Sequence, residues 1–297
     1  MKNSRKAIIY ALIAVAMWST VATAFKLSLQ QMSLLQLLTG ASFFSLLIVG
    51  VCLCQRGELV LALTTFASNI KSICLLAVLN PILYYLVLLK AYALLPAQVA
   101  QSINYTWAIT LTLLSVPMLK HKLTFRDIVA IVLGYVGVVF IAFGGRGIEG
   151  TINGFGIVLA LLSTLIWAGY WLLSARDPRP PLIKLFQSFL IGFPVLFIIT
   201  FYIDGFAQFT EIKPWLYIAY IGTFEMGLAF IFWQLAMHHT DRVSQISTLI
   251  FLSPFASLFI IQSVLGEPIH PLTLIGLGLI IGGILFQKYP RAPRLSQ

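Results

Sequence analysis

One acidic side chain stands deep inside a long apolar stretch of the sequence. Glu225 lies in the middle of residues 215–237, whereas the other acidic residues fall between apolar stretches or at their ends. A carboxylate at the depth of a bilayer is costly unless it is protonated or paired. We predict that Glu225 carries a proton or binds a ligand amine. The alternative is a protonated side chain that is hydrogen-bonded to a neighbouring helix.

A second polar residue interrupts another apolar stretch. Asn80 precedes Pro81 within residues 70–90. Proline removes a backbone hydrogen bond from a helix and frees a carbonyl. An offset of 145 residues matches Asn80 with Glu225. We therefore expect these two side chains to occupy equivalent positions and to face one another across a central cavity.

Several aromatic side chains lie well away from the ends of the apolar stretches, beside amides and a hydroxyl. They are Tyr84, Tyr85, Tyr105, Trp107, Trp167 and Phe251, with the amide of Asn104 among them. A cavity lined by aromatic groups and a few placed polar groups suits a small amphiphilic ligand. We predict that this set binds such a ligand; the alternative for any one of its members is packing within a helix bundle.

The first apolar stretch adds two candidates. Trp18, Ala22 and Lys26 are spaced four residues apart and share one helix face. We place Trp18 in the predicted binding site and expect Lys26 to contact a ligand carboxylate. The alternative for Lys26 is that its ammonium group extends to the outer membrane interface.

Motifs of several enzyme classes are absent from the sequence. It contains no paired-Asp diphosphate motif, no HExxH and no Walker A sequence, and its four histidines lie in loops or at the ends of apolar stretches. We therefore expect neither an enzyme, nor a cofactor, nor a metal site.

Composition indicates the elements that must position these residues. Of 297 residues, 60% are hydrophobic and 9% are charged, whereas soluble domains carry roughly 25% charged residues. A membrane-spanning helix needs about 20 apolar residues. We predict an all-α membrane protein of ten transmembrane helices, at residues 7–27, 33–54, 70–90, 97–118, 124–143, 153–174, 182–203, 215–237, 243–264 and 270–287.

The basic residues orient these helices. With a cytoplasmic N-terminus, fifteen of the nineteen lysines and arginines fall on the cytoplasmic side, as the excess of cations in cytoplasmic loops requires. We therefore predict that both termini are cytoplasmic. The net charge of +10 then reflects membrane topology, and its scattered distribution does not favour nucleic-acid binding.

The two halves of the sequence resemble one another weakly. An offset of 145 residues matches Ala91 with Ala236 and Gly137 with Gly282. Five helices per half is an odd number, so the second copy must be inverted in the membrane. We predict two inverted five-helix repeats, residues 1–147 and 148–297, the second ending in a short basic cytoplasmic tail. Inverted repeats are typical of secondary transporters, whose sites lie where the repeats meet.

A series of short motifs also carries a family resemblance. In chain order they are Met17-Trp18-Ser19-Thr20, Lys26, Asn104-Tyr105-Thr106-Trp107, Gly134-x-x-Gly137, Ile166-Trp167-Ala168, Trp233-Gln234, Leu252-Ser253-Pro254 and Leu265-Gly266-Glu267. In this order and spacing the sequence resembles the drug/metabolite transporter superfamily, specifically its EamA-type ten-helix transporters, over nearly its whole length.

Within that family the sequence is most similar to bacterial aromatic amino-acid exporters. The resemblance implies an inverted five-plus-five helix fold with a central cavity lined by aromatic side chains from the third, fourth, sixth and ninth helices. By matching position these are the six aromatic residues named above. Two features depart from that group: Ala108 replaces a proline, and Lys120-His121-Lys122 replaces a Gly-Glu pair.

We therefore predict a secondary transporter, an exporter of small metabolites with amino acids as the favoured class, that works by alternating access in the inner (cytoplasmic) membrane of the cell. Glu225 is its predicted proton-coupling residue, and its partners are a small-molecule substrate and the lipid bilayer, with a monomer or homodimer as the functional unit. The alternatives are a drug or nucleobase efflux protein with the same fold, and a membrane enzyme or other non-transport membrane protein.

Overall fold

The computed structural model describes residues 3–120, 122–149, 151–205, 211–240, 246 and 248–288, with the side chains of 145–149 and 288 left aside. Every regular element in this part of the chain is a helix. The predicted basic tail after residue 288, His121, and the predicted cytoplasmic cations within residues 1–2 and 241–245 lie outside the described residues.

The N-terminal half contains α1 (Ser4–Leu29), α2 (Leu34–Gln55), α3 (Leu59–Thr64), η1 (Ala67–Asn69), α4 (Ile70–Ala77), η2 (Val78–Leu83), α5 (Tyr84–Leu94), α6 (Ala97–Asn104), α7 (Trp107–Leu119) and α8 (Phe125–Glu149). The C-terminal half contains α9 (Gly154–Arg176), α10 (Pro181–Ile203), α11 (Ile212–Tyr220), η3 (Ile221–Leu228), α12 (Ala229–His238), η4 (Leu249–Phe251), α14 (Leu252–Leu265) and α15 (Pro271–Lys288).

Seven helical stretches of the described chain are long and apolar enough to cross a membrane. They are Ser4–Leu29, Leu34–Gln55, Ala67–Leu94, Phe125–Gly144, Gly154–Arg176, Pro181–Ile203 and Ile212–His238. Two shorter apolar helices, Leu249–Leu265 and Pro271–Gln287, follow them. Large apolar side chains such as Val132, Phe155 and Phe201 are exposed along these helices. Lipid-facing helices have this character, as expected of an all-helical membrane protein.

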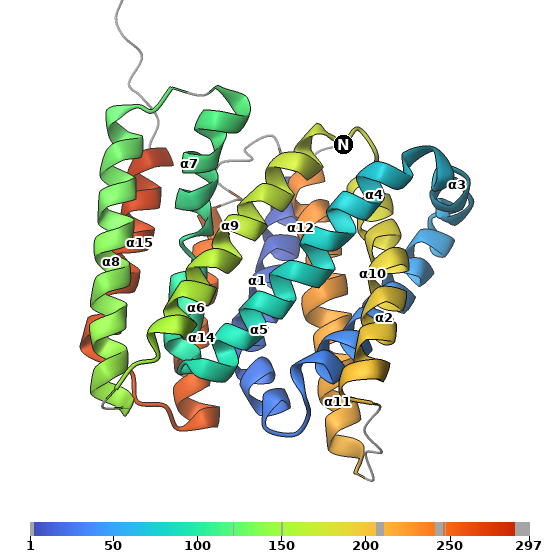
Figure 1. The fold of residues 1–297 in the computed structure, drawn as a ribbon. Helices are drawn as coiled ribbons and strands as arrows, with labels where there is room; N and C mark the ends of the chain where they lie inside the picture. Colours follow the sequence, from blue (N-terminus) through green and yellow to red (C-terminus); the bar gives the residue numbers. More distant parts are fainter. Residues whose placement is uncertain are drawn as a thin grey trace, which may run out of the picture.

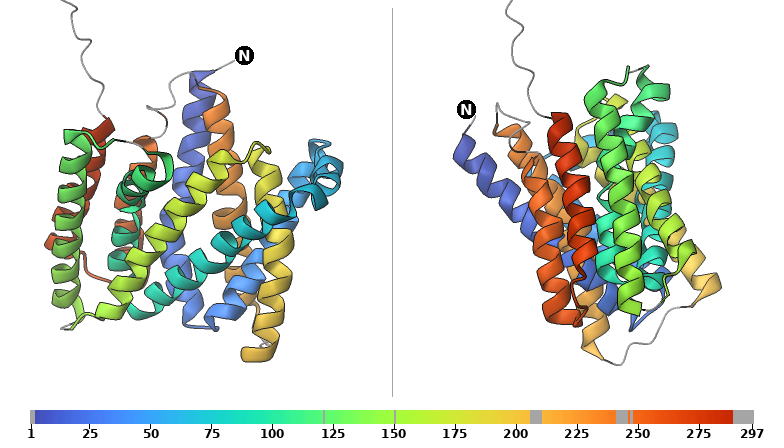
Figure 2. Two further views of the ribbon diagram at one scale, coloured as in Figure 1. Left: turned by 45° about the horizontal axis from the view of Figure 1, so that its top comes forward. Right: turned by 90° about the vertical axis from the view of Figure 1, so that its left-hand side faces the viewer.

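Two helix pairs form opposite flanks of the bundle (Figure 1). The helices α8 and α15 pack side by side on one flank, and α2 packs against α10 on the other. Between them, α9 packs against α5, α6 and α7, while α1 packs against α12 and α14. The described N-terminal residues and the C-terminal end of α15 lie at the same end of the bundle, as both figures show (Figures 1 and 2). We call this the N-terminal side.

Regular α-helix is interrupted at two places in each half. The helical residues 67–94 contain a π-helical segment, η2, in which Asn80 has extended backbone angles and Pro81 lacks an amide donor. A second π-helical segment, η3, contains Glu225. The predicted helix 97–118 tightens at Tyr105–Thr106, where the Thr106 amide and hydroxyl both donate to the Ile103 carbonyl. In the C-terminal half, the short 3-10 helix η4 precedes α14. These changes of helical pitch alter which side chains face inward.

A buried polar cluster joins the α9–α10 loop to the start of α4. The carboxylate of Asp177 accepts hydrogen bonds from Arg179 Nε at 2.9 Å and from Ser72 Oγ at 2.5 Å. Arg179 also donates to Gln187, whose amide donates to the Ala62 carbonyl at 2.6 Å. The cluster therefore ties the loop to α10 and to the short helix α3.

Candidate functional site

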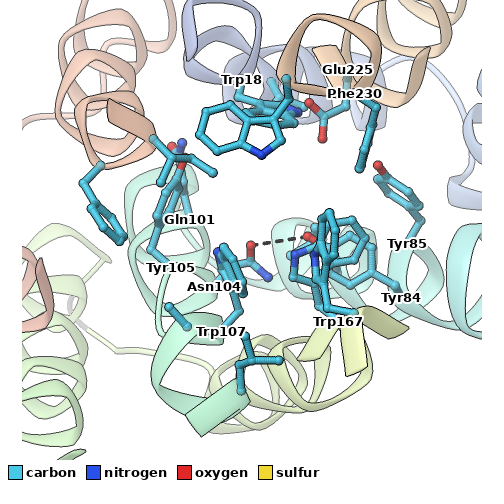
Figure 3. A pocket seen from close by; sticks show the side chains of 18 of the residues that line it. Trp18, Tyr84, Tyr85, Gln101, Asn104, Tyr105, Trp107, Trp167, Glu225 and Phe230 are labelled. Atoms are coloured by element: carbon cyan, nitrogen blue, oxygen red, sulfur yellow. Dashed lines mark hydrogen bonds between the residues drawn. The ribbon is translucent and has the colours of Figure 1, made fainter. Parts of the chain in front are cut away.

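A central cavity of about 400 Å³ lies between the two halves of the chain. It is lined by α1, α5, the α6–α7 segment, α9, the η3–α12 segment and residues 250–251. Most of the lining side chains are aromatic or aliphatic, and the labelled ones surround an open space (Figure 3). The size and character of the cavity fit a small molecule with an apolar body.

Most of the residues selected from the sequence meet in this cavity. Those that line it are Trp18, Tyr84, Tyr85, Asn104, Tyr105, Trp107, Trp167, Glu225 and Phe251. Helical spacing, the π-helical segments and the turn at Tyr105–Thr106 bring them together from six separate stretches of chain. The tertiary fold therefore assembles one site from residues that are up to 233 positions apart, from Trp18 to Phe251.

Two predicted residues lie elsewhere. Asn80 is buried, but it is not among the cavity-lining residues, and its side chain lies within hydrogen-bonding reach of Tyr170. Lys26 is half-buried on α1, and it does not line the cavity either. The arrangement of Asn80 facing Glu225 across the cavity, which the 145-residue offset predicts, is therefore not observed.

Stacked aromatic rings form one wall. The ring centroids of Tyr84 and Trp167 are 4.3 Å apart with an interplanar angle of 25°, and those of Trp167 and Tyr170 are 5.4 Å apart with an angle of 21°. Phe230 packs edge-on against Trp167 at 6.0 Å and against Trp18 at 5.7 Å between ring centroids. The rings hold one another in place, so the wall is a preformed surface for a planar or apolar ligand group.

Asn104 links three helices at the base of this wall. It accepts a hydrogen bond from the Tyr84 hydroxyl at 3.4 Å, which is a long contact, and donates one to Ser163 Oγ at 3.0 Å. Asn104 ends α6, Tyr84 begins α5 and Ser163 lies in α9. The amide fixes the position of the Tyr84 ring and thereby the stack that Tyr84 forms with Trp167 (Figure 3).

Glu225 enters the cavity from the π-helical segment η3. Its carboxylate lies within hydrogen-bonding reach of the Tyr85 hydroxyl, and its second oxygen, Oε2, is buried without a hydrogen-bond partner. Two glycines of η3, Gly222 and Gly227, allow this segment to pack closely against α2. Glu225 is therefore held at the cavity wall with one carboxylate oxygen unpaired among the described residues.

Gln101, which lines the cavity, also carries an unsatisfied group. Ser257 Oγ donates a hydrogen bond to Gln101 Oε1 at 2.5 Å, so the amide nitrogen Nε2 is the remaining donor. That nitrogen is buried and has no partner, and the side chain is 3% exposed. The lining residues therefore carry an unpaired donor on the α6 side and an unpaired acceptor on the η3 side among the described residues.

The two ends of the cavity differ. Away from the N-terminal side, Phe25 packs against Tyr92 at 5.4 Å and against Tyr85 at 6.4 Å between ring centroids, and Phe25 and Tyr92 are almost fully buried. Toward the N-terminal side the lining reaches Met237, which is half-buried, and Ala175, which is exposed. The cavity is therefore closed at one end and extends toward the surface at the other.

Several residues that line the cavity were not predicted from the sequence. The main ones are Phe25, Tyr92, Trp171, Phe230, Trp233 and Met237, and Gln101 was not placed in the predicted site. One signal was available, because positions 230, 233 and 237 share a helix face. Nothing in the local sequence distinguished that face from one that packs within the bundle.

Comparisons with known proteins agree on the fold and the class. The profile of the EamA-like transporter family matches residues 5–143 and 154–287. An uncharacterized transporter encoded in the sor 3′ region of Acidianus ambivalens is 27% identical over 205 residues, which are 67% of this chain and 77% of that one. A crystal structure at 19% identity has the same fold, with a TM-score of 0.65 over 96% of each chain.

Proposed function

Because the chain belongs to the EamA-like transporter family, it is a membrane transporter of small molecules, and we propose that it exports small metabolites, with amino acids and their derivatives as the substrate class. Transport would proceed by alternating access, with the two halves moving against one another around the central cavity. The observation that carries the proposal is the aromatic cavity, closed at one end, between the halves of the chain. Its family relation favours a transporter over a membrane enzyme.

The packing supports the inverted-repeat arrangement. The contacts of α1 with α12 and α14 have counterparts in those of α9 with α5 and the α6–α7 segment. The interruptions also correspond. An offset of 145 residues moves Val78–Leu83 onto positions within Ile221–Leu228, and it moves Tyr105–Thr106 into Leu249–Phe251. Two repeats, residues 1–147 and 148–297, would then contribute equivalent walls to one cavity.

Ten membrane crossings fit this arrangement. Each half would contribute five, counting the stretch broken at Tyr105–Thr106 and the shorter helices α14 and α15. The N-terminal side, where the described ends of the chain meet, would be cytoplasmic in the inner membrane, as the distribution of basic residues predicts. The cavity, which extends toward that side, then corresponds to an inward-facing state.

Glu225 is the proposed proton-coupling residue. It is the acidic side chain on the described lining of the cavity, and one of its oxygens lacks a hydrogen-bond partner. A carboxylate in the middle of a membrane-spanning segment is costly in its charged form, so protonation and substrate binding can compete for it. Exchange of a proton for substrate would couple export to the proton gradient.

A second candidate is efflux of planar drugs or nucleobases. The aromatic lining of the cavity, including the stacked Tyr84 and Trp167, favours it, because apolar rings can contact any planar ring system.

Counterflow in proteoliposomes tests the proposed function. Purified protein would be reconstituted and exchange measured for labelled amino acids and their amides, nucleobases and a cationic dye. Saturable exchange of an amino acid or a derivative, lost in Trp167→Ala, is the expected result. Exchange of nucleobases or dye alone would favour the second candidate. Folded protein that exchanges none of the probes would contradict the transport of these classes.

A further inference from the structure

The charge of the central cavity restricts what it can bind. Among the described residues that line it, Glu225 is the one charged side chain, and Lys26, the sequence-predicted partner of a carboxylate, is not part of the lining. A ligand carboxylate in this apolar space would lose its hydration without gaining an opposite charge. A ligand ammonium group, by contrast, would find the carboxylate of Glu225.

The unpaired polar atoms of the lining restrict the possible ligands further. Three buried side-chain atoms of the lining have no hydrogen-bond partner in the described part of the chain: the acceptor Glu225 Oε2 and the donors Gln101 Nε2 and Trp171 Nε1. Buried polar groups are normally paired, so each of these atoms calls for a complementary group from water or from a ligand. An uncharged carbonyl oxygen complements an amide or indole donor without carrying a charge into the cavity.

Gln101 is the more strongly oriented donor. The hydrogen bond from Ser257 to Oε1 fixes its amide, and the side chain is 3% exposed. Gln101 and Glu225 project from different walls, with the stacked Tyr84 and Trp167 rings nearby (Figure 3). The three features together describe a ligand with an ammonium group, a neutral acceptor and an apolar ring.

We propose that the cavity selects aromatic amines whose second polar group is a neutral acceptor, such as a carboxamide or an ester, over free amino acids. This inference rests on the proposed transport function and specifies its substrate. Glu225 binds the ammonium group, Gln101 donates to the carbonyl oxygen and the aromatic ring lies against Tyr84 and Trp167. Gln101 is thereby a specificity-determining residue.

Competition in proteoliposomes tests this substrate preference. The probe is labelled L-phenylalaninamide, with unlabelled L-phenylalanine, 2-phenylethylamine and 3-phenylpropanoate as competitors. We expect phenylalaninamide to exchange, 3-phenylpropanoate not to compete, and phenylalanine to compete at least about tenfold more weakly than unlabelled phenylalaninamide, because its carboxylate is desolvated. The competitor 2-phenylethylamine, which lacks the acceptor, should be weaker by about fivefold, the effect of one hydrogen bond.

Two variants assign the preference to residues. Gln101→Met removes the donor and should abolish the difference between phenylalaninamide and 2-phenylethylamine. Glu225→Gln removes the charge and should weaken both amines. The matched controls are Gln262→Met and Glu211→Gln, whose side chains are exposed and lie outside the cavity lining. Both controls should retain the wild-type order of competitors.

The outcomes separate this inference from the proposed function. Phenylalanine that exchanges as well as phenylalaninamide would overturn the inference and leave amino-acid transport standing. A difference between the two amines that survives in a folded Gln101→Met variant would remove Gln101 from its role. If Gln101→Met does not fold, the wild-type order of the four compounds still decides the substrate class. Lack of exchange by every probe, here and in the wider panel, would overturn the transport proposal itself.

Discussion

At the scale of single residues, the site depends on side chains that hold one another. Trp167 lies between Tyr84 and Tyr170, and Asn104 fixes Tyr84 from the neighbouring helix. A ligand ring that enters the cavity meets a surface that is already ordered, so little conformational entropy is lost on binding. This makes the aromatic wall the part of the cavity whose truncation should affect binding most directly.

Trp167→Ala should reduce counterflow by more than about tenfold, because aromatic anchors in binding pockets commonly contribute 2 kcal/mol or more. Expression should fall little, since most of the helix packing of α9 is made by other residues. The measurement is the initial rate of counterflow at fixed protein per vesicle. Trp215→Ala, at an exposed position on α11, is the matched control. Unchanged exchange by Trp167→Ala would remove the stacked wall from the proposed site.

Glu225→Gln should abolish the dependence of export on a proton gradient, because glutamine keeps the shape and hydrogen bonding of the side chain but cannot exchange a proton. Exchange without a gradient should remain measurable for a neutral substrate. The comparison is uptake into vesicles with and without an imposed pH gradient, with Glu211→Gln as the control. Gradient dependence that persists in Glu225→Gln would place the coupling at another group.

At the scale of helices, the close approach of α8 and α15 depends on two glycines. A Cβ on Gly137 would meet the Gly276 carbonyl oxygen at 2.5 Å, and one on Gly276 would meet the Gly137 carbonyl in return. Contacts between small residues let membrane helices pack backbone to backbone. A Cβ added to Gly278, two residues further along α15, would meet no atom within 4 Å.

The different surroundings of Gly276 and Gly278 allow a prediction for a matched pair of variants. Gly276→Ala should destabilise the protein by about 1–3 kcal/mol, the usual cost of overpacking, because the carbonyl it meets belongs to the backbone. Gly278→Ala should be neutral or slightly stabilising, since alanine is the better helix former. Thermal unfolding midpoints in detergent compare the two variants. Equal midpoints would show that α8 and α15 do not touch at this crossing.

The loop between α9 and α10 provides a second test at this scale. The hydrogen bond from Arg179 lowers the pKa of the Asp177 carboxyl below its ordinary value, with Ser72 contributing as a second donor. A depressed native pKa means that the carboxylate stabilises the fold above the pKa of the unfolded chain. This stabilisation is lost as the pH falls through the native pKa.

Asp177→Asn should therefore lower the stability at pH 7 by about 3 kcal/mol, because it leaves the buried Arg179 without its counter-ion. The difference between wild type and variant should shrink only below about pH 4, the ordinary range of an unfolded aspartate. Unfolding midpoints in detergent between pH 7 and pH 3 measure it. Glu211→Gln, at an exposed carboxyl, should show no such difference.

At the scale of the whole molecule, the cavity is reached from one side. Its described lining extends to Ala175 near the N-terminal side, and the rings of Phe25 and Tyr92 close the opposite end. A transporter in this state exposes its site to the cytoplasm if both termini are cytoplasmic. Movement of α1 relative to α5 would separate the Phe25–Tyr92 contact and open the other side.

Cysteine labelling checks this orientation. The native Cys52, Cys54 and Cys74 would first be replaced by alanine. Ala175→Cys should react with a membrane-impermeant maleimide only in inside-out vesicles, whereas Glu211→Cys, at the opposite end of the bundle, should react only in right-side-out vesicles. Tyr92→Cys should be protected from both sides. The reverse pattern for the first two positions would invert the proposed topology.

The sequence by itself determined the membrane class, the family and most of the candidate site. Apolar stretches about 20 residues long have few stable structures other than spanning helices, and polar residues inside them are rare enough to be noticed individually. The family resemblance, read from short motifs such as Asn104-Tyr105-Thr106-Trp107, was confirmed by the family match. Glu225 and Trp167 were identified because their types are unusual at those depths.

Only the tertiary structure decided which side chains share the cavity. Asn80 and Lys26 lie outside its lining although their sequence positions favoured them, and Phe230 and Trp233 line it although their sequence context resembles ordinary packing. For Phe230 and Trp233 the physical reason is that the π-helical segment η3 rotates the residues that follow it. Helical periodicity cannot anticipate that rotation. Lys26 follows Trp18 by eight residues on the regular helix α1, which turns it about 80° away around the helix. The hydrogen bond that orients Gln101 comes from Ser257, 156 positions away, and it exists only once the two halves have packed together.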